Sequence, residues 1–223
     1  MQMETEERNL KADPAIVATW VEGWAMTRQV PPPVFENGAY RIEVGLPDQK
    51  RRHVFSACSH HVRKYAETID EPFVFLKVCA PPELVRPHLP PRWRIETPGY
   101  MMQLSGRMAG SVNALPDGYS FSREELGSGG TLMNIRDASG EIAATGRIAF
   151  PGELAIYDRI RTHENHRRRG LGRALMQKLE MIAAGRGLTG AVLVATPDGR
   201  ALYETLGWKL HSLYTTAGIP WSY

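Results

Sequence analysis

Cysteine is scarce in this chain of 223 residues, which contains only Cys58 and Cys79. The two thiols form no CxxC pair and have no histidine at the spacing of a zinc site, so they provide neither a disulfide scaffold nor a structural metal centre. We therefore predict two reduced thiols and no bound metal. Long apolar runs are also absent: no stretch approaches the ~18 consecutive apolar residues of a membrane helix, and the sequence predicts no membrane partner.

The N-terminal segment MQMETEERNLKADP is polar and acidic, without the positive start and apolar run of a secretory leader. The sequence therefore predicts a cytoplasmic protein in which residues 1–12 form a flexible tail. Hydrophobic residues make up 43% of the chain and charged residues 23%, which is typical of a globular protein with one large core or two small ones.

The net charge is only +3, but the positive excess is concentrated in one place. Residues 161–173, RTHENHRRRGLGR, contain five arginines against the single Glu164. Concentrated positive charge beside glycines indicates a small, highly charged anion, whereas nucleic-acid binding usually spreads its basic residues over a wider face. We predict no nucleic-acid partner, and DNA binding through this cluster stays open as an alternative.

The first half of the chain predicts short helices and strands. Asp13 and Pro14 are a favourable helix start, and the apolar residues after them indicate a helix over residues 14–28. Further along, the patterns predict strands at 41–44, 52–56, 73–78 and 93–96 and helices at 59–68 and 83–88. Residues 97–129 give no clear pattern beyond a weak strand at 119–122.

The second half is more regular. It predicts strands at 131–136, 141–150, 153–161, 191–195 and 208–214, with helices beginning at Leu171 and over 198–206. Residues 40–96 have a shortened form of the same β-β-β-α-β-α-β order. We therefore predict an α/β fold with a mixed sheet and two similar halves, residues 13–102 and 103–223. Chance similarity of the two orders stays open.

Residues 158–175 combine a strand, a tight loop and a helix start. The first N–H groups of a helix are unpaired and lie at the positive end of its dipole, so they bind phosphates. Gly170 and Gly172 allow an anion to approach the backbone, while neighbouring arginines supply charge-assisted hydrogen bonds. The segment has neither the GxxxxGK[ST] of a P-loop nor the GxGxxG of a dinucleotide-binding turn.

This segment resembles the pyrophosphate loop of the GNAT superfamily of N-acetyltransferases, whose [RQ]xxGx[GA] pattern is met by Arg167, Gly170 and Gly172. Residues 201–208, ALYETLGW, are similar to the LYxxxGF segment of the same superfamily. The resemblance covers roughly residues 130–215 and implies a GNAT-like acyl-CoA N-acyltransferase fold with a splayed central sheet. Residues 103–223 would form the acetyl-CoA-binding domain, and residues 13–102 a degenerate GNAT-like unit or a substrate-side subdomain.

The resemblance also implies how acetyl-CoA, the co-substrate, would bind. The strand that ends at residues 160–162 would separate from the strand at 191–195, and the pantetheine arm would pair with the backbone groups set free. The pyrophosphate would lie on the amides of residues 167–173. The implied binding residues are Ile160, Arg161, Thr162, Arg167, Arg168, Arg169, Gly170, Leu171, Gly172, Arg173 and Thr196. Thr196 stands where the family often has an asparagine.

Two residues are candidates for acid and base. Tyr203 stands where family members often place the acid that protonates the leaving thiolate, and the structural alternative is an aromatic side chain that packs the last helix onto the sheet. Asp158 alternates with Ile156 and Ile160 along its strand, and an acid among apolar neighbours could serve as a base. Its structural alternative is a salt bridge with Arg159 or Arg136.

The implied activity is transfer of an acetyl group from acetyl-CoA to a primary amine of a small-molecule or peptide acceptor. A non-catalytic acyl-CoA-binding regulatory module is the alternative. The sequence identifies neither the acceptor nor the oligomeric state, and both a monomer and a homodimer stay open.

Overall fold

The computed structural model describes residues 6–7, 9–110 and 114–220. The helices are α2 (Pro14–Arg28), α3 (His60–Thr68), α4 (Pro82–Val85), α5 (Leu171–Ala184) and α6 (Pro197–Glu204), with short 3-10 turns η1 (Arg86–His88) and η2 (Glu164–His166). The strands are β1 (Val34–Glu36), β2 (Ala39–Leu46), β3 (Gln49–Phe55), β4 (Val74–Val78), β5 (Arg94–Ile95), β6 (Gly99–Ser105), β7 (Ser120–Glu125), β8 (Thr131–Arg136), β9 (Ile142–Ala149), β10 (Leu154–Thr162), β11 (Gly190–Ala195) and β12 (Lys209–Gly218).

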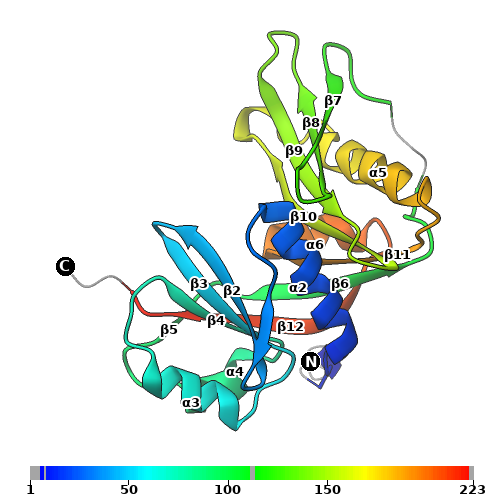
Figure 1. Ribbon diagram of the computed structural model, residues 1–223. Coiled ribbons are helices and arrows are strands. Elements are labelled where there is room, and N and C mark those ends of the chain that lie inside the picture. Colours follow the sequence, from blue (N-terminus) through cyan, green and yellow to red (C-terminus); the bar gives the residue numbers. More distant parts are fainter. Residues whose placement is uncertain (1–5, 8, 111–113, 221–223) are drawn as a thin grey trace.

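The strands form one sheet in the order β1-β2-β3-β4-β12-β6-β11-β10-β9-β8-β7, and β5 pairs with β12 off this path. The N-terminal lobe contains β1–β5, α3 and α4, and the C-terminal lobe contains β7–β11, α5 and α6. The long strands β6 and β12 lie side by side and join the two lobes (Figure 1). Parallel and antiparallel pairs occur in both lobes, so the prediction of a mixed α/β sheet is confirmed.

Both lobes have the same arrangement of strands around a parallel pair. In the N-terminal lobe, α3 joins the parallel strands β3 and β4; in the C-terminal lobe, α5 joins the parallel strands β10 and β11. Each lobe also contains a strand that is distant in sequence from its neighbours in the sheet. β6 is inserted between β11 and the first part of β12, while the last part of β12 is inserted between β4 and β5.

This strand arrangement corrects the predicted boundary between residues 102 and 103. Met102 is in the middle of β6, and its neighbours across the sheet are Leu193 on β11 and Leu210 on β12. A boundary here would cut a strand that is hydrogen-bonded on both sides. The two predicted regions are therefore joined by a continuous sheet and not by a linker.

Helix α2 lies between the lobes (Figure 1). The Asp13 side chain accepts a hydrogen bond from the amide of Ala15 and caps the helix, and Pro14 occupies its first turn. Trp20 and Trp24 of α2 are buried in a core cluster with residues of β2, β3, β6, β10, β11 and β12. Helix α5 packs against β8–β10, around the separate core of the C-terminal lobe.

Most predicted elements are confirmed with small shifts at their ends. The helix at 14–28 and the strand at 131–136 have the predicted bounds, while the last strand continues to Gly218. Sequence reasoning missed β1 and β6. In the segment predicted as a flexible tail, Glu7 Oε1 pairs with Arg200 Nη2 at 2.5 Å, and Ala12 is buried. Residues 1–5 and 8 of that segment lie outside the described part.

Candidate functional site

Strands β10 and β11 pair with each other over only three residues each, Leu154–Ile156 and Gly190–Val192. Beyond this point β10 continues along β9, and β11 continues along β6. The β10–β9 register shifts between Asp158 and Arg161, and Arg159 has a left-handed φ of 52°. Such a bulge bends a strand. The two parallel strands therefore separate after Ile156, as the predicted splay requires.

The corresponding strands of the N-terminal lobe remain together. β3 and β4 pair over five residues each, Arg51–Phe55 and Val74–Val78, and the amide of Cys79 extends the ladder to the carbonyl of Phe55. No backbone groups are freed along this pair. The two lobes thus share a topology, but the parallel strands separate in the C-terminal lobe and stay paired in the N-terminal lobe.

Helix α5 begins with amides that have no side-chain cap. Its N-cap is Gly170, at a φ of 78°, and the first helical hydrogen bond joins the amide of Ala174 to the carbonyl of Gly170. The amides of residues 171–173 belong to the unpaired first turn. A Cβ at Gly170 would meet no described atom within 4 Å, so the space in front of the helix is open. By contrast, α3 is capped by Ser59, whose Oγ accepts from the amide of His61.

The five arginines of residues 161–173 have no carboxylate within 4.0 Å among the residues the structure describes. Arg167 Nε donates to the carbonyl of Thr162 at 3.4 Å, and Arg173 Nη2 donates to Thr205 Oγ1 at 2.7 Å. Arg161, Arg167, Arg168 and Arg169 are exposed. Their positive charge is therefore not neutralised by neighbouring side chains and is available to an anion.

Tyr119, which sequence reasoning missed, helps to fix this loop. Its hydroxyl lies 2.8 Å from His166 Nδ1 and accepts a hydrogen bond from Arg169 Nη1 at 3.1 Å. On the other side of the imidazole ring, His166 Nε2 lies 3.7 Å from Asp137 Oδ2. The loop is thereby tied to the β7–β9 edge. The weak pattern of residues 97–129 offered no signal for this contact.

Tyr203 projects from α6 into the core of the C-terminal lobe. The side chain is buried, and its ring centroid lies 6.2 Å from that of Trp208. Burial raises the pKa of the Tyr203 phenol, and the negative charge of Asp158 raises it further. The two candidate catalytic residues therefore lie near enough to interact electrostatically, although β10 and α6 are far apart in sequence. The packing role expected as the structural alternative is present as well.

Asp158 forms a salt bridge, but not with either expected partner. Arg28, at the end of α2, donates from Nε to Oδ2 at 2.5 Å and from Nη2 to Oδ1 at 3.0 Å. Thr27 Oγ1 adds a third hydrogen bond, at 3.1 Å. The expectation of Arg159 or Arg136 was wrong because it considered only nearby strands, whereas α2 lies against the face of β10 that presents Asp158.

The remaining predicted residues lie at the ends of the two separating strands. Thr196 follows β11 directly and caps α6, since its Oγ1 accepts from the amide of Gly199 at 3.2 Å. This leaves its hydroxyl proton for a ligand. Ile160 packs against the C-terminal core, and Thr162 ends β10. A Cβ at Gly172 would meet Leu202 Cδ2 at 3.2 Å, so glycine permits the close approach of α5 to α6.

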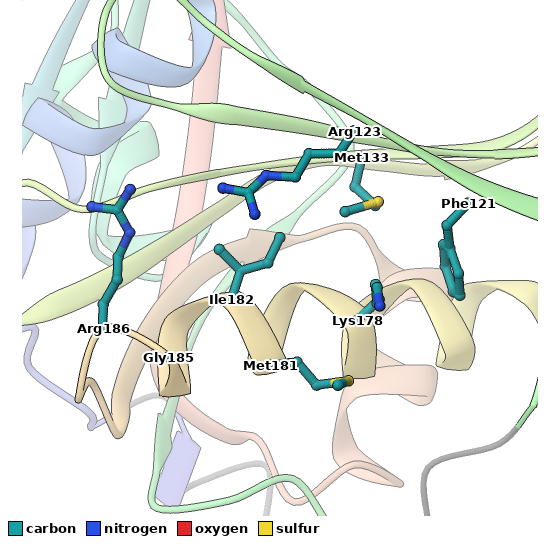
Figure 2. A pocket seen from close by; sticks show the side chains of 8 residues that line it. All are labelled: Phe121, Arg123, Met133, Lys178, Met181, Ile182, Gly185 and Arg186. Atoms are coloured by element: carbon teal, nitrogen blue, oxygen red, sulfur yellow. The ribbon is translucent and has the colours of Figure 1, made fainter.

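A separate groove of about 600 Å³ lies between α5 and the strands β7 and β8 (Figure 2). Lys178 Nζ lies 5.3 Å from the ring centroid of Phe121 at one end, and Arg186 lies at the other end. The lining residues are Phe121, Arg123, Met133, Lys178, Met181, Ile182, Gly185 and Arg186. None of them is a predicted site residue, so this groove is distinct from the opening between β10 and β11.

Residues 93–208 match the Acetyltransferase (GNAT) family. Because the match covers more than half of the chain, this protein belongs to the GNAT acetyltransferase family, whose co-substrate is acetyl-CoA. The region matched includes β6, the opening, the arginine loop and Tyr203. No curated protein matches the chain.

Solved structures have the same fold at low sequence identity. A GCN5-related N-acetyltransferase from Kribbella flavida is 16% identical, with a TM-score of 0.64, and the alignment covers 95% of this chain and 97% of that one. A putative GNAT-family acetyltransferase from Novosphingobium aromaticivorans is 20% identical, with a TM-score of 0.55 and coverage of 91% and 98%. A tandem GNAT protein from the clavulanic acid biosynthesis pathway is 17% identical, with a TM-score of 0.53 and coverage of 74% and 69%. At these identities the similarity establishes the fold.

None of the helices in the described part of the chain is long and apolar enough to cross a membrane. Among the same residues, no group of three or more histidine, cysteine, aspartate or glutamate side chains could hold a metal ion.

Proposed function

We propose that the protein transfers the acetyl group of acetyl-CoA to a primary amine of a small-molecule or peptide acceptor. One observation carries the proposal: the β10–β11 pair opens next to an uncapped helix start, while the corresponding pair in the N-terminal lobe is closed and its helix is capped. The C-terminal lobe would bind the co-substrate, and the N-terminal lobe would not.

The binding residues fit a ligand with a diphosphate and an extended arm. The free amides of residues 171–173 and the exposed arginines before them would bind the diphosphate. The backbone groups of β10 and β11 that face the opening would pair with the amide groups of the arm, in place of the strand contacts they lack. Thr196 would donate its hydroxyl proton.

Bound acetyl-CoA would supply a thioester that an amine can attack directly. Tyr203 holds a proton at its hydroxyl, because burial and Asp158 both raise its pKa, and it is proposed to deliver that proton to the leaving sulfur. Asp158 is proposed to accept the proton that the amine loses. The three hydrogen bonds from Arg28 and Thr27 fix the carboxylate and leave about one of its four lone-pair sites for the amine.

Hydrogen exchange tests the binding half of this proposal. Acetyl-CoA should slow exchange of the amides at residues 168–173 and leave the start of α3, at residues 60–62, unchanged as an internal control. Equal protection of both helix starts, or of neither at saturating ligand, would contradict it.

Thiol release tests the chemistry. Tyr203→Phe should lower kcat with an accepted amine by about a hundredfold or more, since general acids typically contribute 10²–10⁴-fold. Its affinity for acetyl-CoA should stay within a few-fold of the parent. Tyr40→Phe, in the N-terminal lobe, is the matched control and should keep full activity. An unchanged kcat in Tyr203→Phe would refute the acid role, and binding without turnover of any amine would refute the transferase.

A further inference from the structure

Arg52 is a buried cation that has no carboxylate partner within 4.0 Å among the residues the structure describes. It lies on β3, and its side chain is part of a residue only 7% exposed. The guanidinium carbon lies 3.6 Å from the ring centroid of Trp24 on α2, and Nη2 donates to Gln49 Oε1 at 2.6 Å. The buried Nε has no hydrogen-bond partner among the described residues. A buried guanidinium with an unused donor is an arrangement that proteins normally complete with an anion.

Lys77 on β4 faces the same side of the sheet. The β3–β4 register pairs Arg52 with Phe75 and Val54 with Lys77, so Arg52 and Lys77 are two positions apart on one face. Lys77 Nζ donates to Thr216 Oγ1 on β12 at 3.0 Å. No described carboxylate lies within 4.0 Å of this ammonium. Two cations thus share one face, and no described residue places an anion between them.

The electrostatics indicate that this face has too much positive charge. Burial and, to a smaller extent, the charge of Arg52 together lower the pKa of Lys77 to about 7. Burial also lowers the pKa of Arg52 to about 10, and Arg28 adds to that effect. The opposing carboxylates are Glu96, which is exposed, and Asp158, which already pairs with Arg28.

Arg52 lies close enough to Asp158, the proposed base, for the two charges to interact. Arg52 stacks on the helix that supplies Arg28 to Asp158, and the charge of Asp158 influences both Arg52 and Tyr203. Tyr214 of β12 lies in the same core cluster as Trp24, and its buried hydroxyl also has no partner among the described residues. Buried donors that lack partners thus accumulate between the lobes, next to the proposed position of the amine.

We infer that the acceptor amine also bears a carboxylate, and that Arg52 and Lys77 bind this carboxylate between the two lobes. The inference rests on the proposed transferase function and names its substrate class. Arg52 offers its Nε edge and Lys77 its ammonium, which suits the two oxygens of a carboxylate. Neither residue is assigned a part in proton transfer.

Paired amines test this inference in the full-length protein. Thiol release from acetyl-CoA is measured with amino acids and their primary amides, and with ω-amino acids of several lengths and the n-alkylamines of matched length. We expect kcat/KM for the accepted carboxylate to exceed that of its carboxylate-free partner at least tenfold. Equal rates within each pair would overturn the inference and leave the transferase standing. If no amine of either kind releases thiol, the proposed function itself fails.

Substitutions then connect the preference to these residues. Arg52→Gln and Lys77→Met should each lower kcat/KM for the carboxylate at least tenfold, mainly through KM, and leave the amide or alkylamine rate unchanged. Arg51→Gln, on the opposite face of β3 and paired with Glu43, is the control and should keep the preference. If Arg52→Gln does not fold, the inference is tested by Lys77→Met together with the rates of the parent protein on the paired amines. A carboxylate preference that survives in the folded variants would refute the assignment.

Discussion

His53 should make the stability of this protein unusually sensitive to mild acid. The residue lies on β3 and is 4% exposed, and its ring centroid is 4.6 Å from that of Tyr65. Its buried Nδ1 has no hydrogen-bond partner among the described residues. Burial and, to a smaller extent, the charge of Arg51 together lower the pKa of His53 from 6.5 to about 4.

The size of the effect follows from the two pKa values. The unfolded chain binds a proton at His53 near pH 6.5, whereas the folded protein binds it only near pH 4. Between these values the unfolded state carries more protons, so the free energy of unfolding falls as the pH falls. At about 1.4 kcal/mol per pKa unit, the full loss is about 3 kcal/mol, and about 2 kcal/mol of it occurs between pH 7 and pH 4.5.

Urea unfolding at pH 7 and at pH 4.5 measures this loss. His53→Phe retains a ring of similar size that cannot titrate, so its loss between the two pH values should be smaller than that of the parent by about 2 kcal/mol. Protonation of carboxylates lowers the free energy of unfolding of both proteins by the same amount, so this contribution cancels when the two losses are compared. His60→Gln, at an exposed position, should behave as the parent. Equal losses in the parent and His53→Phe would refute the reasoning.

Two further predictions concern packing. A Cβ at Gly23 of α2 would lie 2.6 Å from Ile156 Cβ, an atom close to the backbone of β10 that cannot move away by a rotamer change. Gly23→Ala should therefore lower the free energy of unfolding by about 1–3 kcal/mol. Glu22→Ala, on the exposed face of α2, is the control and should change this free energy little. A gain in stability for Gly23→Ala would contradict the close helix–strand contact. Burial raises the pKa of Cys79 to about 12. An alkylating reagent at pH 8 should therefore modify at most Cys58 in the folded protein, and both thiols in urea. Rapid modification of both thiols in the native state would contradict the burial of Cys79.

Local patterns were sufficient for the elements around the arginine loop. Gly170 permits a left-handed φ, and the apolar residues after it recur at helical spacing. In the strand before it, apolar and polar residues alternate. Strand, loop and helix can therefore each be predicted from short-range sequence patterns. The helix at 14–28 was equally accessible because Asp13 and Pro14 fix its start by short-range contacts. The family motif then led to the prediction of which of these residues bind the co-substrate.

Strand β6 was beyond such reasoning. Its sequence, GYMMQLS, contains no β-branched residue, and it becomes a strand because β11 and β12 hydrogen-bond it on both sides. This pairing joins residues about a hundred positions apart and has no short-range signature. The insertion of β6 between β11 and β12, and the failure of the boundary at 102/103, follow from it.

The sequence by itself determined the conformation of the arginine loop at residues 161–173, since glycine conformation, helix ends and clustered arginines act within a few residues of one another. Only the tertiary structure decided which groups meet between the lobes. Arg28 reaches Asp158 across 130 positions, and Arg52 and Lys77 come together with Thr216 through the pairing of β3, β4 and β12. Composition could not anticipate the unbalanced charge of Arg52 and Lys77. This imbalance appears only when α2 packs between the two lobes and removes water from these particular side chains.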